Sequence, residues 1–371
     1  MTLHIFNPEH DIALASGLSN FTAPHAGRQL RHDLGFLPAT WAQEGDTIMV
    51  DDPEQAERAA QKLAHRVKCL LGTKTLPQVN WESSNARQVA SRHSADSTGQ
   101  NLRVEPWGWN SALRAMLIRK GVGEESMPTL PQLDTIRELS HRRTAANLLK
   151  ELRIARTTGE SFECRQPEKV EALLAKYREL VMKAPWSSSG RGLRFLSAER
   201  TPFEQQANWF RNIVNSQGSV MVEPYYNKMK DFGMEFYSDG KGGISYLGLS
   251  LFHTANGAYT GNILATEKVK REMISRYLPT ELLDNVQEKI CQRLSATFKG
   301  CYEGPFGVDM MIVQPSTFHL PQTTLHPCVE INLRRTMGHV ALSLAPQDDD
   351  IRCVMRIAYS DNYYKLTINK L

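Results

Sequence analysis

Residues 180–195, Leu-Val-Met-Lys-Ala-Pro-Trp-Ser-Ser-Ser-Gly-Arg-Gly-Leu-Arg-Phe, decide the fold. The first three are apolar and predict a short buried strand, so Lys183 lies at the end of a sheet. The hydroxyl and N–H groups of the following loop can bind an anion, and its glycines let the backbone approach that anion closely. The stretch predicts a phosphate-binding site, with an ordinary Ser/Gly turn as the alternative. The loop residues are Ser187, Ser188, Ser189, Gly190, Arg191 and Gly192.

The composition is that of an ordinary globular protein. The 371 residues exceed what one hydrophobic core usually supports and predict two or three subdomains. The formal charge of +4 is small and the charged residues are interspersed, so neither a nucleic-acid nor a membrane partner is expected. The six cysteines form no C-x-x-C pair, which disfavours zinc and disulfides. Because residues 1–15 contain no unbroken apolar segment, we expect a cytoplasmic protein.

The N-terminal third predicts alternating strands and helices. Asn110 or Ser111 is well placed to cap one of the helices, and glycines and prolines gather at 121–131, where a subdomain boundary is expected. Strands are predicted at 3–6 and 47–50, and apolar residues at helical spacing predict a helix at 54–67. This alternation predicts the α/β class.

The middle of the chain predicts a mixture of helices and antiparallel strands. A basic helical region at 133–152 contains Arg142 and Arg143, and such a region is usually a solvated face. Apolar spacing predicts helices at 203–214 and 280–298, and a Gly-rich turn joins strands predicted at 232–237 and 244–252.

A proline breaks the strand predicted at 219–226. Pro224 removes a donor and fixes φ, so the strand ends there or runs along a sheet edge. Backbone groups near Glu223 and Tyr225 would then lack ladder partners, as binding to the edge of an adenine requires. A plain strand end is the alternative.

Acidic side chains occur on two later strands, predicted at 306–313 and 328–333. Asp309 interrupts an otherwise apolar strand, and Glu330 and Asn332 share one face of the next. Buried carboxylates on neighbouring strands need a cation to neutralise them. Oxygen ligands suit Mg²⁺ or Mn²⁺ rather than zinc, and the spacing allows a pair of ions.

Arg334 extends the same face by one step. A guanidinium there can bind a terminal phosphate through two N–H groups. The alternative for the whole segment is a surface hairpin whose polar face meets water. The phosphate-binding loop upstream favours a nucleoside triphosphate held between Lys183 and a metal-bearing sheet.

Taken together, these motifs resemble the ATP-grasp superfamily, over about residues 139–344. No Walker-type G-x-x-x-x-G-K-[ST] motif is present. The family usually has a second lysine at the start of the helix before the phosphate loop, where this chain has His141-Arg142-Arg143. The motifs are Lys-x-x-x-Ser-Ser-Ser-Gly-Arg-Gly (183–192), Val-Glu-Pro-Tyr-Tyr (222–226), Gly-Met-Glu-Phe (233–236), Gly-Val-Asp (307–309) and Glu-Ile-Asn-x-Arg (330–334).

The resemblance implies an ATP-grasp fold. It implies an N-terminal Rossmann-like domain over 1–132 and two α+β lobes, over 133–222 and 223–371, with ATP between them. The phosphates would contact Lys183, the loop 187–192 and an arginine, either Arg142 or Arg143. Adenine would lie against the hinge, which is Glu223, Pro224, Tyr225 and Tyr226.

The remaining implied roles concern the ribose, the metal and the transferred group. Glu235 would contact the ribose and Met311 the nucleotide. Arg334 or Arg335 would stabilise the phosphoryl group in transit. The implied metal ligands, for two Mg²⁺ ions, are Asp309, Glu330 and Asn332.

The resemblance also implies a reaction. ATP-grasp enzymes mostly activate a substrate carboxylate as an acyl phosphate and join it to an amine. A kinase of the same fold and a non-catalytic ATP-binding module are the alternatives. A homodimer is compatible with the sequence. The acceptor site would lie near residues 252–262, with His253 or Tyr259 steering the amine. Residues 7–11 and 107–109 would line it too, unless they are a plain loop and core aromatics.

Overall fold

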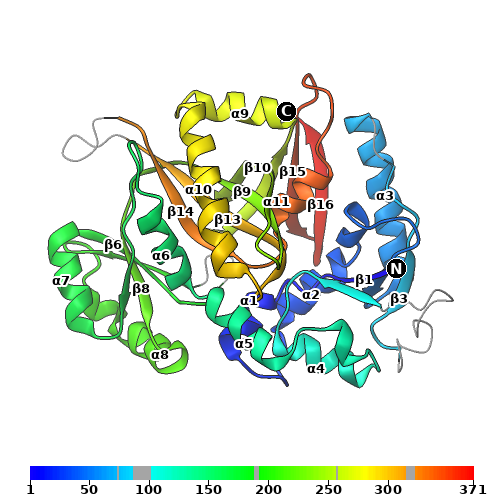
Figure 1. Ribbon diagram of the computed structural model, residues 1–371, viewed down its shortest axis with the longest axis horizontal. Coiled ribbons are helices and arrows are strands. Elements are labelled where there is room, and N and C mark those ends of the chain that lie inside the picture. Colours follow the sequence, from blue (N-terminus) through cyan, green and yellow to red (C-terminus); the bar gives the residue numbers. More distant parts are fainter. Residues whose placement is uncertain (73–74, 87–101, 188–191, 256–257, 315–321) are drawn as a thin grey trace.

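The computed structural model describes residues 1–371 except 73–74, 87–101, 188–191, 256–257 and 315–321. The described chain forms four sheets, each of four strands, with helices packed on them. Figure 1 shows a sheet with the helices α7 (Pro167–Tyr177) and α8 (Ala207–Gln217) at one end of the molecule. Helix α3 (Pro53–Leu71) and the strands β15 (Cys353–Ser360) and β16 (Tyr363–Lys370) lie at the other end. The predicted α/β class is confirmed.

The N-terminal sheet is parallel, in the order β3-β2-β1-β4. The predicted cap is confirmed, because the Asn110 side chain accepts a hydrogen bond from the Leu113 N–H at the start of α4. The elements are β1 (Thr2–Ile5), α1 (His10–Ser16), α2 (His25–Leu34), η1 (Leu37–Thr40), β2 (Thr47–Val50), α3 (Pro53–Leu71), β3 (Asn80–Ser83), β4 (Arg103–Pro106), α4 (Ser111–Arg119) and η2 (Glu124–Ser126).

The region predicted as one basic helix at 133–152 is two helices, α5 (Leu130–Leu139) and α6 (Arg142–Glu151). The break occurs because His141 has extended backbone angles and its ring nitrogen accepts a hydrogen bond from the Arg143 N–H, capping α6. Apolar residues of both helices pack into the same core as β9 and β13. The first turn of α6 is thereby held against the strands that carry the acidic residues.

A smaller antiparallel sheet has the order β5-β8-β6-β7 and its own apolar core. Gly218, at φ 84°, ends α8 in the left-handed region. The elements are β5 (Phe162–Cys164), α7 (Pro167–Tyr177), β6 (Glu179–Lys183), β7 (Leu193–Ser197), η3 (Phe203–Gln206), α8 (Ala207–Gln217) and β8 (Val220–Pro224).

The central sheet is antiparallel, in the order β10-β9-β13-β14, and the predicted 238–243 turn joins β9 to β10. The prediction for the last strand was too short, because β14 begins at Thr324 and includes Pro327. The β13–β14 register is irregular between Asp309 and Met311, and such a bulge tolerates a proline. The elements are β9 (Lys228–Asp239), β10 (Ile244–Ser250), α9 (Glu267–Ser275), α10 (Thr280–Phe298), β13 (Glu303–Val313) and β14 (Thr324–Asn332).

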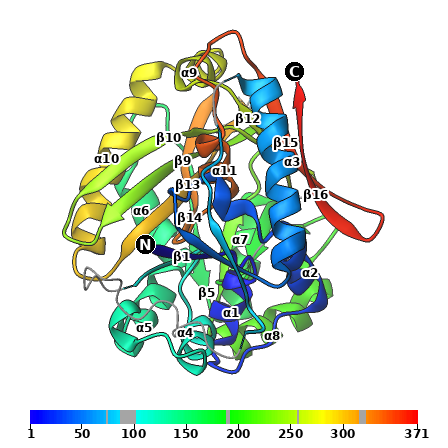
Figure 2. The ribbon, with the colours of Figure 1, turned by 90° about the vertical axis from the view of Figure 1, so that its right-hand side faces the viewer.

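The last sheet joins the middle of the chain to its C-terminal end, in the order β11-β12-β15-β16. Its core is shared with α3 and with α11, which lies between the sheets (Figure 1). The tip of the β15–β16 hairpin projects beyond the helices in Figure 2. The elements are β11 (Phe252–Ala255), β12 (Ala258–Leu264), α11 (Met337–Ser343), β15 (Cys353–Ser360) and β16 (Tyr363–Lys370).

Candidate functional site

Lys183 is the last residue of β6 and forms a buried ion pair. Its Nζ lies 2.5 Å from Oε2 of Glu223, on the neighbouring strand β8. The other oxygen, Oε1, accepts a hydrogen bond from the Ser161 hydroxyl at 3.2 Å. Both charged side chains are less than 10% exposed, so each supplies the neutralising partner that a buried charge requires.

The described ends of the predicted phosphate loop lie close together. The Ala184 N–H donates to the Gly192 carbonyl at 2.8 Å, which extends the β6–β7 pairing. A Cβ on Gly192 would lie 2.4 Å from the Ser187 side chain, so a glycine is required there. The predicted contacts of Ser188, Ser189, Gly190 and Arg191 lie outside the described residues.

The hinge differs from the prediction at one backbone group. Pro224 ends β8 as expected, but the Tyr225 N–H donates to the Glu179 carbonyl at 2.9 Å. The expectation that this N–H lacks a partner was therefore wrong, because β6 continues beside the hinge. The Tyr225 ring is half exposed, and the Tyr226 ring meets His326 edge to face at 5.5 Å.

The acidic residues on β13 and β14 face each other. Asp309 and Glu330 are directly opposed in the antiparallel register, and Nδ2 of Asn332 donates to Oδ2 of Asp309 at 3.0 Å. Burial, then the charges of Glu330 and Glu235, raise the pKa of Asp309 to about 8. A Cβ on Gly233 would meet both the Asp309 and Glu235 carboxylates, at 3.4 and 3.8 Å. The carboxylates are thus crowded on one face of the central sheet.

Arg142 connects this acidic group to the phosphate loop. Its Nη1 lies 2.9 Å from Oε2 of Glu330, while Nε donates to the Ala184 carbonyl at 3.0 Å and Nη2 to the Ser187 hydroxyl at 3.3 Å. Arg142 thus supplies a cation to Glu330, and the predicted metal ligands Asp309, Glu330 and Asn332 stay a prediction. Arg143 points elsewhere and pairs with Glu163 at 3.3 Å.

The two candidate catalytic arginines diverge. Arg334 binds Asp11 of the N-terminal domain through two N–H groups, at 2.9 and 2.8 Å, and donates to Oδ1 of Asn332 at 3.0 Å. Burial opposes the charge of Arg334, but the adjacent Asp11 raises its pKa. Arg335 instead lies over the Trp41 ring at 4.4 Å, with Glu105 at 3.6 Å. Burial lowers the pKa of Arg335 to about 10.

Glu235, expected to contact the ribose, is instead enclosed beneath α11. It is 3% exposed, and its Oε2 lies 3.0 Å from Nδ1 of His339. A Cβ on Gly338 would lie 1.8 Å from Oε1, so the carboxylate fills the space that this glycine leaves. This carboxylate supports the first turn of α11, and its predicted contact with a ribose stays a prediction. Met311 remains on the face of Asp309, opposite His326 in the register.

His326 is a candidate site residue that the sequence reasoning missed. It is fully buried on β14, and neither ring nitrogen has a hydrogen-bond partner among the described residues. Burial lowers its pKa to about 4, and Glu223 and Lys183 are its nearest charged influences. Its spacing of four residues from Glu330 places it on the same face of β14, and the register sets it opposite Met311, so the period of two is the signal that could have found it.

The candidate acceptor residues have mixed outcomes. Asp11 reaches the site through Arg334, while His10 is buried against Gly108, and burial lowers its pKa to about 4. Trp107 is a core residue packed edge to face on Phe6 at 5.0 Å. The Tyr259 hydroxyl donates to the Asn262 side chain at 2.6 Å, which is a structural contact within β12. His253 lies on β11, and burial lowers its pKa.

The donor set fits a hard divalent cation. Within the described ranges, no three His, Cys, Asp or Glu side chains form a group able to hold a metal. The predicted set is smaller, with two opposed carboxylates and one amide oxygen, which is the chemistry that Mg²⁺ or Mn²⁺ prefers. Burial first, and then the charges of Glu330 and Glu235, raise the pKa of Asp309, and the charge of Arg334 opposes this rise. A second positive group beside Arg142 would relieve this repulsion.

Comparisons with known proteins give similarity in fold alone. No protein-family model and no curated protein sequence matches the chain. Solved structures do match, and one of those named here is described as a protein of the ATP-grasp superfamily. All have TM-scores below 0.5, so the reaction assigned to this chain has to rest on its own site.

Three of these structures illustrate the range. N5-carboxyaminoimidazole synthetase from Staphylococcus aureus, complexed with ADP, is 10% identical, with a TM-score of 0.47 and coverage of 86% of this chain and 84% of its own. The biotin carboxylase domain of Hydrogenobacter thermophilus 2-oxoglutarate carboxylase is 13% identical, with a TM-score of 0.49 and coverage of 86% of this chain and 76% of its own. A protein assigned to the ATP-grasp superfamily from Archaeoglobus fulgidus is 14% identical, with a TM-score of 0.43 and coverage of 100% of this chain and 99% of its own.

One further expectation concerns membranes. No helix in the described part of the chain is both long enough and apolar enough to cross a lipid bilayer.

Proposed function

We propose that this chain is an ATP-dependent ligase of the ATP-grasp type. It would activate a substrate carboxylate as an acyl phosphate and join it to an amine, with release of ADP and phosphate. The observation that carries the proposal is the position of Arg142, which contacts both the end of the phosphate loop and Glu330. One side chain thereby links the residue after β6, the first residue of the predicted phosphate loop and strand β14, which are far apart in the sequence.

The cations of the site are suited to hold a triphosphate. Lys183 and Arg142 are both less than 10% exposed, and each is neutralised by one glutamate. Phosphate oxygens would compete with Glu223 and Glu330 for these cations, so nucleotide binding would rearrange two existing ion pairs. Mg²⁺ held by Asp309, Glu330 and Asn332 would supply charge neutralisation at the phosphate oxygens.

The proposed chemistry needs position and charge rather than a protein nucleophile. An oxygen of the substrate carboxylate attacks the γ-phosphorus, and the bond to the ADP oxygen breaks. The amine lone pair then attacks the acyl carbon, phosphate leaves, and the amine loses a proton. Arg334 would stabilise the charge on the phosphoryl group in transit, because Asp11 and Asn332 fix the plane of its guanidinium.

The proposal is tested by ADP release with ATP and Mg²⁺ over a panel of carboxylic acids, with and without amines. Hydroxylamine traps an acyl phosphate as a hydroxamate, which a kinase acting on a hydroxyl group would not yield. We expect ADP release that depends on an acid, and hydroxamate formation with the same acid. Glu330→Ala should abolish both with the fold intact, whereas Glu281→Ala, on the exposed side of α10, should not. Wild-type activity in Glu330→Ala would refute the metal assignment.

A further inference from the structure

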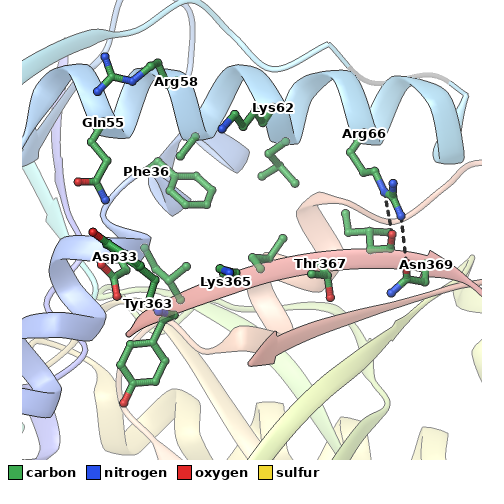
Figure 3. Close-up of a pocket in the computed structure, with 16 residues that line it drawn as sticks. Asp33, Phe36, Gln55, Arg58, Lys62, Arg66, Tyr363, Lys365, Thr367 and Asn369 are labelled. Atoms are coloured by element: carbon green, nitrogen blue, oxygen red, sulfur yellow. Dashed lines mark hydrogen bonds between the residues drawn. The ribbon is translucent and has the colours of Figure 1, made fainter. Parts of the chain in front are cut away.

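A groove lies between helix α3 and strand β16, away from the site described above. Its volume is about 600 Å³. Figure 3 shows the side chains of α3 along one side and those of β16 along the other. Its floor is apolar and includes Leu34, Phe36, Leu63 and Leu366, which belong to or pack on the core beneath. The groove therefore combines an apolar base with two polar walls.

The strand wall is a sheet edge. In the order β11-β12-β15-β16, β16 is the last strand among the described residues. The Tyr364 N–H donates to Oδ2 of Asp33 at 2.8 Å, and the Ile368 carbonyl accepts from Nε of Arg66 at 2.9 Å. Backbone groups in an antiparallel strand alternate sides, so the Leu366 groups between them face the groove too. In the described part of the chain, no side chain bonds to the Leu366 backbone.

The helix wall is basic. Arg58, Lys62 and Arg66 recur every four residues and so lie in one row along α3 (Figure 3). Lys365 adds a fourth cation from β16, which is paired with Asp361 at 2.6 Å, whereas Asp33 is the one acid among the described residues that line the groove. Arg58 has only an exposed ion pair with Glu54, and Lys62 has no ion pair within the described residues. The groove therefore has an excess of positive charge.

The two walls have matching lengths. The part of α3 from Gln55 to Arg66 extends about 17 Å at the helical rise. The part of β16 from Tyr363 to Asn369 extends about 20 Å at the strand rise. The cation row from Arg58 to Arg66 extends about 12 Å beside the longer backbone edge, which has the length of a short extended peptide.

We propose that this groove binds an extended acidic peptide segment of a partner protein, which adds as a strand to β16. The backbone groups of Leu366 supply ladder hydrogen bonds, and alternate acidic side chains of the peptide meet Arg58 and Lys62. A peptide is favoured because the edge offers both donors and acceptors in strand register, and an acidic one because the wall is basic. The inference does not depend on the proposed ligase activity.

The test uses fluorescence anisotropy of the full chain with a labelled heptapeptide that alternates Glu and Val. We expect the Arg58→Glu/Lys62→Glu variant to bind at least about tenfold more weakly, because two attractions become repulsions. Lys68→Glu is the matched control, because Lys68 is an exposed cation of the same helix outside the groove, and it should bind within about twofold of the wild type.

Two further probes separate strand addition from simple charge attraction. Methylation of every second peptide amide nitrogen can be made in two alternating patterns, or phases. One of the two phases should weaken binding at least about tenfold, because it removes the peptide N–H groups that donate hydrogen bonds to β16. A Lys/Val peptide should not bind. The proposal is overturned if the Glu/Val peptide fails to bind, if neither methylated phase weakens it, or if Lys68→Glu weakens it equally. Self-association of the chain that Lys62→Glu abolishes would assign the groove to a second copy and also overturn it.

Discussion

Replacing Asp309 with asparagine should stabilise the ligand-free protein in a manner that depends on pH. In the folded chain, burial and the charges of Glu330 and Glu235 raise the pKa of Asp309 from 3.8 to about 8. The folded state therefore holds the proton more tightly than the unfolded state does. The stability contributed by this proton is present at low pH and is lost as the pH rises from about 3.8 to about 8. Asparagine is neutral throughout and keeps an oxygen for the Asn332 amide.

The magnitude follows from the pKa difference. One unit corresponds to about 1.4 kcal/mol, so the difference in unfolding free energy between variant and wild type should grow by at most about 4 kcal/mol from pH 5 to pH 8. Asp309 keeps partial solvent access, which reduces the effect. We expect about 2 kcal/mol, which for a chain of this length corresponds to a relative rise in Tm of about 3 °C.

The assay is thermal or urea unfolding of both proteins between pH 4 and pH 9 in EDTA. Asp134→Asn, on the exposed face of α5, is the control and should show a difference independent of pH. If the difference in unfolding free energy between Asp309→Asn and the wild type does not change with pH, or shrinks as the pH rises, the idea that the ionised carboxylate is destabilised in the folded chain is refuted. The same variant should lose turnover, because a stabilising change at a functional site removes the charge that function needs.

Three other substitutions test the remaining contacts. Lys183→Met should destabilise the fold by about 3 kcal/mol in urea unfolding, because it leaves the buried charge of Glu223 without a partner. The double variant Lys183→Met/Glu223→Gln should recover that stability, but it should not recover nucleotide binding measured by calorimetry. Gly338→Ala should lower Tm although alanine has the better helix propensity, because the new Cβ would overlap the Glu235 carboxylate. An unchanged Tm would mean that this carboxylate can move away. Arg334→Lys should reduce kcat by about 100-fold with a KM for ATP within about threefold, in steady-state ADP release; an equal rise in KM would place Arg334 in ground-state binding.

Local sequence patterns predicted most of the elements correctly. The alternation around Asp309 and the spacing of residues in 280–298 are properties of a single strand and a single helix, and both elements are present. The period of two also placed Asp309 on one face of its strand and Glu330 on one face of the next, whereas their direct opposition came from the pairing register. The family resemblance implied a helix start near His141, whereas the pattern of 133–152 by itself indicated only a basic helical region, because an N-cap is decided by backbone angles that such a sequence does not reveal.

The sequence by itself determined the α/β class, the positions of the main strands and helices, and which acidic, basic and glycine residues are available to a site. Only the tertiary structure decided which charges pair. Arg142 rather than Arg143 meets Glu330, Arg334 binds Asp11 from more than 300 positions away, and Arg335 turns toward Trp41. The physical reason is that periodicity fixes the face of an element on which a side chain lies. The partner depends on how separate elements pack, and buried charges take whichever counter-charge that packing brings within reach.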